Sequence, residues 1–457
     1  MSNGLSFNPN SFDPGTMATN LATAATQDAQ QLLYAQSQAA QATSQGLTTL
    51  QNALSAFSTA LSGLSSLPGQ SVTKYSATLG NTALGTATAN NSAVPGTYTL
   101  SVQQVATQNA ISFNNVSTTA VPKPPAPGST IAITLQNGSA ATISLSSSTG
   151  SMSPADIARA INQQSNGVVT ATIVTGTNGS GQPTTQLTLT SGVSGAQGAI
   201  ASIAYNANGG SGSNPLNMAQ STTTVAAQDA IATVNGVTVQ QGSNTLTAIP
   251  GVTLNLTQAQ ATGAAATTLI VARDNNGTDA QVQNFVNAYN TVHQALDGLT
   301  AIGRDGSASG AFANDAGLKS LEGALSSTLR RSFGGQSLMQ LGVSADTSGN
   351  LSLNTTTLNN VLNTNPTALD NVLGNASLSS PSGLLGSLST VVKSWTDPAT
   401  GQIHQRQQSE ATLSKSLASK QTALTKQYND DYDRYMAKFT ALQGLQAQMA
   451  QTLSMFS

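Results

Sequence analysis

Residues 413–453 read LSKSLASKQTALTKQYNDDYDRYMAKFTALQGLQAQMAQTL. Apolar residues return there every three or four positions, which predicts a long helix with one apolar stripe. Polar residues separate them, so the stripe suits a coiled coil and is too polar for a membrane span. A helix with one bare apolar stripe needs a partner. The stripe consists of Leu413, Leu417, Leu424, Tyr428, Tyr432, Tyr435, Phe439, Leu442, Leu445, Met449, Leu453 and, just beyond this stretch, Phe456.

A second stripe of this kind lies near the other end of the chain. Its spacing alternates between three and four residues, and a seven-residue period extends it toward the N-terminus, as in coiled coils. We expect the two terminal helices to meet each other, or the equivalent helices of neighbouring copies; packing of the N-terminal helix on its own domain is the alternative. The N-terminal set is Leu47, Leu50, Leu54, Phe57, Leu61 and Leu64, and the period runs through Leu33, Ala40, Leu47, Leu54 and Leu61. The residues predicted to contact other copies of the chain or a partner protein are these six with Leu424, Tyr428, Tyr435, Phe439, Leu442, Met449 and Leu453.

Composition narrows the function classes. The chain has 457 residues, enough for two to four domains. Only 7% of residues are charged and the net charge is -2, so nothing draws the chain generally to nucleic acid or to an anionic membrane. Cysteine is absent, which excludes disulfides, thiolate metal sites and a thiol nucleophile. No Lys or Arg precedes Lys74, so we expect no cleaved signal peptide.

The middle of the chain, from about Ser71 to Arg273, is rich in short alternating runs of Thr, Val and Ile and is expected to form strands. Asn235-Gly236 predicts a tight hairpin. Residues 122–128 and 206–215 are expected to be connectors, and Ser153-Pro154 is expected to begin one short helix between them. The sequence thus predicts an outer β domain inserted into an inner one.

Helix formers return after this β region. Thr278 and Gln281 are spaced as a capping box, residues 341–353 are expected to form two short strands, and Asn365-Pro366 is expected to begin a further helix. The predicted fold is therefore α+β and multidomain. We expect a helical leg from 1–45 and 405–457, a helical domain from 46–69 and 276–404, an inner β domain from 70–115 and 228–275, and an outer β domain from 116–227.

No constellation of catalytic residues can be assembled. His293 and His404 are far apart in the sequence, and an isolated histidine is usually structural. The acidic cluster around Asp430 lies on a helix with cations in pairing reach, so a solvated face is the better interpretation than a metal site. The loop at Asp274 lacks the twelfth-position glutamate of a calcium loop. We expect no enzyme activity, no cofactor and no metal.

Several blocks of sequence, in order along the chain, resemble the flagellar filament cap proteins, the hook-associated protein 2 family. Only the stretch of about 115–227 lacks a counterpart, and the N-terminus departs from the family because an Asn/Pro/Ser stretch follows Gly4-Leu5 where the family has charges. The blocks are residues 94–106 (VPGTYTLSVQQVA), 235–254, 285–290 (FVNAYN), 341–351 and 434–449.

The resemblance implies a rod of terminal helices, a helical domain and two β domains. It also implies a homo-oligomer, pentamer or hexamer, at the extracellular tip of the filament, which promotes insertion and polymerisation of flagellin. The implied partners are flagellin, the hook-associated junction protein and an export chaperone on the C-terminal helix. Export would follow the flagellar type III route without a cleaved signal, with no nucleic-acid or membrane partner.

Two other functions remain compatible with the residues. Another axial flagellar component, a junction protein or a flagellin, would share terminal helices around a β middle. A tip adhesin would bind host mucin or other glycans through the β domains.

Overall fold

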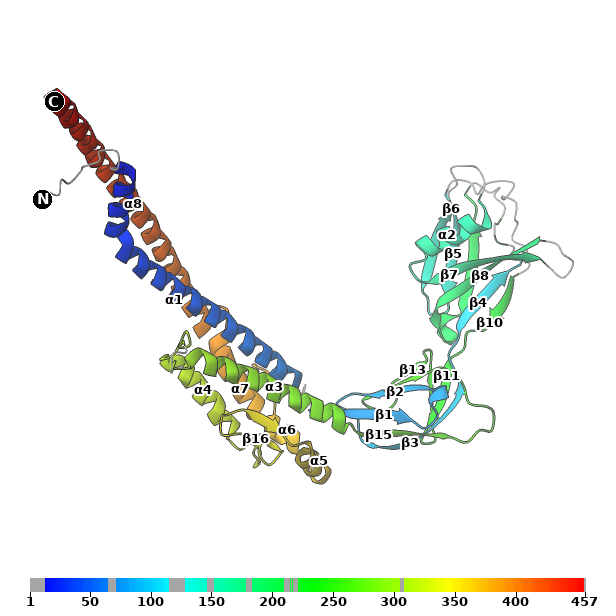
Figure 1. Cartoon of the computed structure of the whole chain (residues 1–457). Helices are drawn as coiled ribbons and strands as arrows, with labels where there is room; N and C mark the ends of the chain where they lie inside the picture. The colour runs from blue at the N-terminus through cyan, green and yellow to red at the C-terminus, as the bar shows by residue number, and fades with distance from the viewer. Residues whose placement is uncertain are drawn as a thin grey trace. The chain divides into compact units, whose positions relative to one another are not determined.

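The computed structural model describes residues 13–64, 71–114, 128–145, 152–177, 183–208, 214, 216, 221–304 and 308–455. The chain divides into two compact units (Figure 1). One combines residues 1–68 with 278–457, and the other is the continuous segment 69–277. Where the structure describes it, the first unit is helical with one β-hairpin, and the second consists mainly of β-sheets with one α-helix.

Two long helices come from the two ends of the chain. They are α1 (Pro14–Leu64) and α8 (Gln402–Ser454), and both were expected from the apolar periodicity. Asp13 begins α1 because its carboxylate accepts hydrogen bonds from the backbone N–H groups of Gly15 and Thr16, at 3.1 Å each. Pro14 then takes the first helical position, where its missing N–H costs nothing.

The rest of the first unit forms a helical domain around the end of α1. Phe57 is fully buried, with its ring centroid 5.9 Å from that of Phe285 and 6.2 Å from that of Tyr289. Rings at such distances contribute more than their buried area alone. The elements are α3 (Asn275–Thr300), α4 (Ala316–Leu329), α5 (Thr355–Thr364), α6 (Ala368–Leu373), α7 (Gly383–Thr396), β16 (Val343–Ala345) and β17 (Leu351–Leu353).

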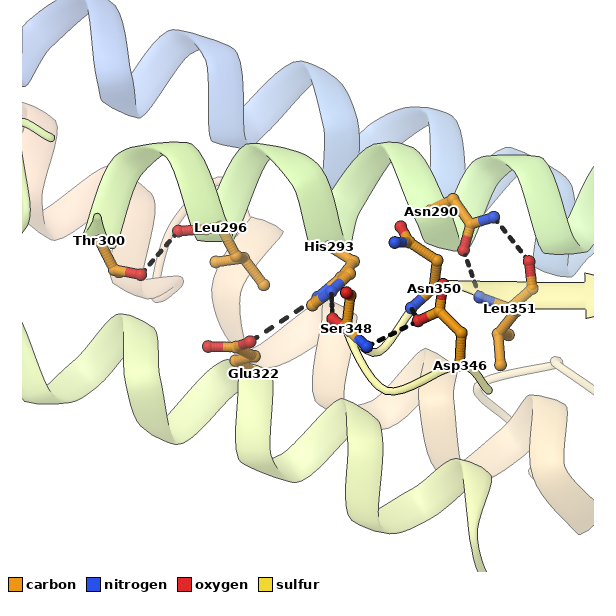
Figure 2. A network of polar contacts seen from close by, with 9 residues as sticks. All are labelled: Asn290, His293, Leu296, Thr300, Glu322, Asp346, Ser348, Asn350 and Leu351. Carbon is orange, nitrogen blue, oxygen red and sulfur yellow. Dashed lines mark hydrogen bonds and ion pairs between the residues drawn. The ribbon is translucent and has the colours of Figure 1, made fainter. Parts of the chain in front are cut away.

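A polar network holds the β16–β17 hairpin against α3 (Figure 2). His293 Nε2 lies 2.7 Å from the Ser348 carbonyl, and Asn290 exchanges two hydrogen bonds of 2.9 and 2.7 Å with the Leu351 backbone. Asp346 closes the turn by accepting from the backbone N–H of Ser348 and of the residue two further on, both at 2.9 Å. His293 is therefore a structural residue, as its isolation in the sequence indicated.

Two helix starts differ from those expected. The Asp274 carboxylate accepts from the backbone N–H of Gly277 at 2.9 Å, so α3 begins before Thr278, and Thr278 is buried inside its first turn. The expected start at Asn365-Pro366 is also wrong, because Asn365 ends α5 instead. Its backbone N–H bonds the Val361 carbonyl, and α6 begins only at Ala368. A turn separates the two helices, in which the Ala368 backbone N–H donates to the Asn365 carbonyl at 3.1 Å.

In the second unit, the described residues of the inner β domain pack a sheet in the order β1-β15-β3-β11-β12 against a smaller sheet in the order β13-β14-β2. The Asn235-Gly236 turn between β11 and β12 has φ angles of 47° and 83°, as the predicted tight hairpin requires. The strands are β1 (Tyr75–Leu79), β2 (Gly85–Ala89), β3 (Gly96–Gln104), β11 (Ala230–Val234), β12 (Val237–Gln241), β13 (Thr245–Leu246), β14 (Val252–Leu256) and β15 (Thr267–Arg273).

The outer β domain has its own core, in which helix α2 covers strands of two sheets. The sheets run β10-β4-β8-β7 and β6-β5-β9. Helix α2 begins as predicted: Ser153 and Asp156 form a reciprocal capping box and Pro154 follows Ser153. The elements are β4 (Gln108–Phe113), β5 (Ser129–Leu135), β6 (Ala140–Leu145), α2 (Pro154–Gln164), β7 (Val169–Thr177), β8 (Pro183–Ser194), β9 (Ile200–Asn206) and β10 (Ser221–Val225).

The predicted boundary between the β domains is wrong on one side. Residues 108–115 were expected in the inner domain, but β4 pairs with β8 and β10 in the outer sheet. No Gly or Pro marks the crossing between β3 and β4, so the sequence carried no signal for it. The predicted connector at 122–128, apart from Gly128, and most of 206–215 lie outside the described residues.

Truncating Phe57 tests the core of the helical domain. We expect Phe57→Ala to reduce the free energy of unfolding of this unit by about 3–5 kcal/mol, since it leaves a cavity between α1 and α3. Trp395, the chain's only tryptophan, reports this unfolding by fluorescence in urea. Tyr34→Ala, at a side chain 68% exposed, is the control and should change little. A loss below about 1 kcal/mol for Phe57→Ala would contradict the packing described here.

Candidate functional site

Helices α1 and α8 run antiparallel, side by side (Figure 1). Leu33 and Ala40 of α1 form one apolar cluster with Leu417 and Leu424 of α8. Further toward the helical domain, Gln407 Nε2 donates to Gln51 Oε1 at 2.8 Å. These contacts fix the register of the pair and show that the two terminal helices meet within one chain. They meet through the N-terminal extension of the seven-residue period, at Leu33 and Ala40, while the stripe around Phe57 packs on the helical domain, which was the alternative expectation.

Beyond Leu33, toward the start of α1, the seam changes to small residues. Ala18 and Ala22 have no exposed surface, and the same register places them opposite Phe439 and Tyr435, which are half-buried. The buried Thr26 hydroxyl donates to the Ala22 carbonyl at 2.9 Å, so it needs no partner from α8. Small residues facing aromatic ones let the helices approach closely.

Helix α8 continues past the point where α1 begins. In this register Pro14 lies near Gln443, so the remaining turns of α8 have no described segment of α1 beside them. An exposed apolar stripe results, which we call the distal stripe. Its side chains are 41% to 68% exposed, and it consists of Leu442, Leu445, Met449 and Leu453.

The structure separates the predicted interface residues into three groups. The N-terminal six are at most 2% exposed and belong to the core around the end of α1 within their own chain, so they offer no free surface to a partner. Leu424 packs in the seam, while Tyr428 joins Tyr435 and Phe439 as half-buried residues of α8. Only Leu442, Met449 and Leu453 of the predicted set are open to a partner. The first group consists of Leu47, Leu50, Leu54, Phe57, Leu61 and Leu64.

An ion pair anchors the base of α8 to the helical domain. The guanidinium of Arg406 donates to both carboxylate oxygens of Asp315, at 2.6 and 2.9 Å. It also lies 5.8 Å from the ring centroid of Phe312 and 5.6 Å from that of Trp395. The hydrogen bonds from Arg406 outweigh the effect of burial and hold the pKa of Asp315 below its usual value of 3.8. Such forked pairs set orientation as well as adding energy.

This anchor escaped the sequence-based prediction. Asp315 carries a local signal, since its side chain accepts from the Leu318 backbone N–H as a helix cap. Its partner lies 91 residues away. Nothing in one sequence pairs two residues at that separation.

The described residues offer no arrangement for catalysis by a metal. None of them form a group of three or more His, Asp or Glu side chains placed to hold an ion. Within the same residues, no helix has the length and apolarity needed to cross a membrane. The acidic cluster on α8 is paired, with Lys426 Nζ 2.6 Å from Asp430 and Arg434 2.5 Å from Asp431. Asp430 is exposed as expected, but Asp431 is buried, so the cluster is only in part a solvated face.

The ion pair gives the helical domain a defined acid sensitivity. Because the folded pKa of Asp315 is lowered, its contribution to stability is complete above about pH 4 and is lost as the pH falls through the lowered pKa. We expect Asp315→Asn to cost about 1–2 kcal/mol at pH 7, with both partners partly exposed, and nearly nothing near pH 2. Urea denaturation followed by Trp395 fluorescence across this range measures the difference.

Asp297→Asn, at an exposed position on α3, is the matched control. It should keep the native dependence on pH. If Asp315→Asn also kept the native dependence of stability on pH, the ion pair would not be the cause of the acid sensitivity.

Comparisons with known proteins agree with this architecture. Residues 10–109 match the model of the flagellar hook-associated protein 2 N-terminus, and residues 227–451 match that of its C-terminus. A lateral flagellar hook-associated protein 2 of Vibrio parahaemolyticus is 31% identical over 388 residues, which cover 81% of this chain and 83% of the relative. A B-type flagellar hook-associated protein 2 of Pseudomonas aeruginosa is 28% identical over 413 residues, covering 83% of each chain.

Among solved structures, the D1-D2-D3 domains of the flagellar cap protein FliD from Escherichia coli align with a TM-score of 0.62 at 26% identity. The alignment covers 81% of this chain and 99% of that one. The two family models flank residues 110–226, which contain the outer β domain except the first two residues of β4. The chain belongs to the flagellar hook-associated protein 2 family, the cap proteins of the flagellar filament.

Proposed function

We propose that this protein caps the distal tip of the flagellar filament as a homo-oligomer and promotes the insertion and polymerisation of exported flagellin beneath it. Membership of the family supports this function over that of a junction protein or a flagellin. The observation that carries the mechanism is the distal stripe of α8. It is a row of exposed apolar side chains on the part of α8 that extends beyond the start of α1. Exposed apolar surface on a helix favours a helical partner.

The distal stripe is the surface by which each subunit contacts its neighbours or the filament end. Removing apolar surface from water contributes about 25 cal/mol per Å², and four such side chains in a row form a strong anchor. The same stripe is available to an export chaperone before assembly, which agrees with a chaperone that binds the C-terminal helix.

The seam between α1 and α8 suits a leg that detaches and re-seats as flagellin subunits are added. Its described apolar cluster has four buried members, two on each helix, whereas the helical domain buries many more large side chains. Opening the seam near Ala18 and Ala22 loses little buried surface, because these side chains are small. The helical domain stays folded while the leg moves.

Assembly and export complete the proposal. We infer five or six copies per cap, a contact with the hook-associated junction protein at the first stage of assembly, and export by the flagellar type III route without a cleaved signal. The chain has no cysteine, so no disulfide has to be broken before it passes unfolded through a narrow channel. The assembled cap lies outside the cell.

Charging the distal stripe tests this mechanism. We expect the double variant Leu445→Asp with Met449→Asp to abolish filament growth and to release flagellin as free monomer, because two carboxylates on the stripe would have to be desolvated at the contact. Electron microscopy of filaments and the amount of flagellin in the medium give the result. The purified variant should keep the helical and β content of the native chain.

The matched control is Ala447→Asp with Gln451→Asp. These exposed residues have the same spacing on α8 but lie on the opposite face of the helix. The control should form filaments of native length. Normal filaments from the stripe variant, or equal loss in both variants, would contradict the role of the distal stripe.

A further inference from the structure

The two β domains of the second unit are joined by more than their covalent connections. The chain crosses between them twice, from β3 to β4 and from β10 to β11. The crossings pair with each other: Thr107 and Gln228 form an antiparallel bridge, and the Thr107 hydroxyl donates to the Ala226 carbonyl at 2.6 Å. Two paired segments alone make a narrow ribbon, which can bend.

A third attachment lies beside this ribbon. The turn after β8, in the outer domain, reaches the inner domain at Asp229 and at the end of β12. There Ser194 Oγ donates to the Gly242 carbonyl at 2.7 Å, and the Gly195 backbone N–H donates to the Thr107 carbonyl at 3.1 Å. An attachment beside a ribbon removes the bending freedom that the ribbon alone would leave.

Asp229 provides the strongest bonds of this attachment. Its Oδ1 accepts from the Ala196 backbone N–H at 2.7 Å, and its Oδ2 accepts from Gln240 Nε2 at 2.8 Å. Its own carbonyl accepts from Gln104 Nε2 at 2.7 Å. The carboxylate therefore connects the outer-domain turn to strand β12 of the inner domain, while its backbone is bound to β3.

The sequence around Asp229 is unusual in its charge. Asp229 is the only charged residue between Arg159 and Arg273. The donors around the carboxylate are uncharged. Their hydrogen bonds hold the pKa of Asp229 below its ordinary value, and the bond from the Ala196 N–H has a larger effect than the bond from the Gln240 amide. A carboxylate that accepts from such donors binds them more strongly than a neutral side chain would.

The backbones at this attachment approach too closely for side chains. Gly195 has φ of 85°, and a Cβ built on it would lie 2.4 Å from the Gly242 Cα and 2.8 Å from Asp229 Oδ1. A methyl group there would push the outer-domain turn away from the inner domain. The attachment thus requires glycine on geometric grounds as well as the carboxylate.

We propose that Asp229 is a latch that fixes the outer β domain on the inner one, with Gly195 providing the close approach that the latch requires. Asp229 is a positioning residue: it binds no ligand and acts by holding two domains in one orientation. The latch stands on the contacts of a single chain. What the latch does for the cap rests on the proposed function: a rigid pair of β domains would hold the surfaces of each cap subunit in constant positions.

Spin-label distances on the full-length chain test the latch. The chain lacks cysteine, so Thr170→Cys on β7 and Val237→Cys on β12, both exposed, place one label on each domain without removing any native thiol. We expect one narrow distance distribution in this parent. Asp229→Ala and Gly195→Ala should each widen it at least twofold and should expose the Ala196 amide to hydrogen exchange.

Matched controls separate the latch from general damage. Gly138→Ala places the same methyl group at the same φ of 85°, in a turn with no neighbour within 4 Å. Asp156→Ala removes the carboxylate of the α2 capping box, which lies within the outer domain. Both controls should keep the narrow distribution even where they lower the stability of the outer domain. Asp229→Asn keeps one oxygen acceptor and should give an intermediate width.

Two results would overturn the latch. One is a broad distribution in the parent, and the other is a distribution in Asp229→Ala and Gly195→Ala as narrow as in the parent. Thermal unfolding of each variant shows that the domains are folded during the measurement. The distances are measured on dilute monomer without flagellin. The latch can therefore be refuted while the capping function stands, and the capping function can be refuted while the latch stands.

Discussion

The antiparallel pairing of α1 with α8 is the constraint on which the rest of the structure depends. It joins the two ends of the chain, so every other element lies in a loop closed by this seam. The loop-closure entropy rises only slowly with loop length, which makes a large insertion tolerable once the ends are held. At its inner end α1 contributes Phe57 to the helical domain, and at the base of α8 Arg406 binds Asp315. The seam is thus anchored through both helices.

The same insertion of one part of the chain within another occurs in each domain. Segments before and after an inserted part meet in each domain: α1 and α8 in the first unit, β3 and β11 in the inner β domain, and β4 and β10 in the outer one. In each case a flanking strand or helix pairs with its counterpart across the insertion. Stability at each level therefore depends on contacts between distant parts of the sequence, and these form late relative to local helices and hairpins.

The sequence was most informative where one local pattern was sufficient. The apolar periodicity of α1 and α8, the Asn235-Gly236 hairpin and the cap at Ser153 were all predicted correctly, because each depends on neighbouring residues. Prediction failed where neighbours compete, as at Asn365, or where a strand such as β4 lacks turn residues before it. For the candidate site, the period found both stripes and indicated that the two terminal helices pair, but it could not show that the stripe around Phe57 is covered by α3. The partners of Asp315 and Asp229 also lie too far along the chain to be inferred.

The scarcity of charge gives the remaining ionic groups particular weight. With 7% of its residues charged, the chain has few carboxylates, and several of them bind across long separations, as Asp315 does to Arg406, Asp279 to Asn359 and Asp229 to Ala196. Many exposed side chains of the β domains are uncharged Thr, Ser and Asn. A carboxylate held by several donors resists rotation far better than one hydroxyl contact does. A chain with so few charges can therefore hold its joints rigid and still keep a surface that attracts few other partners.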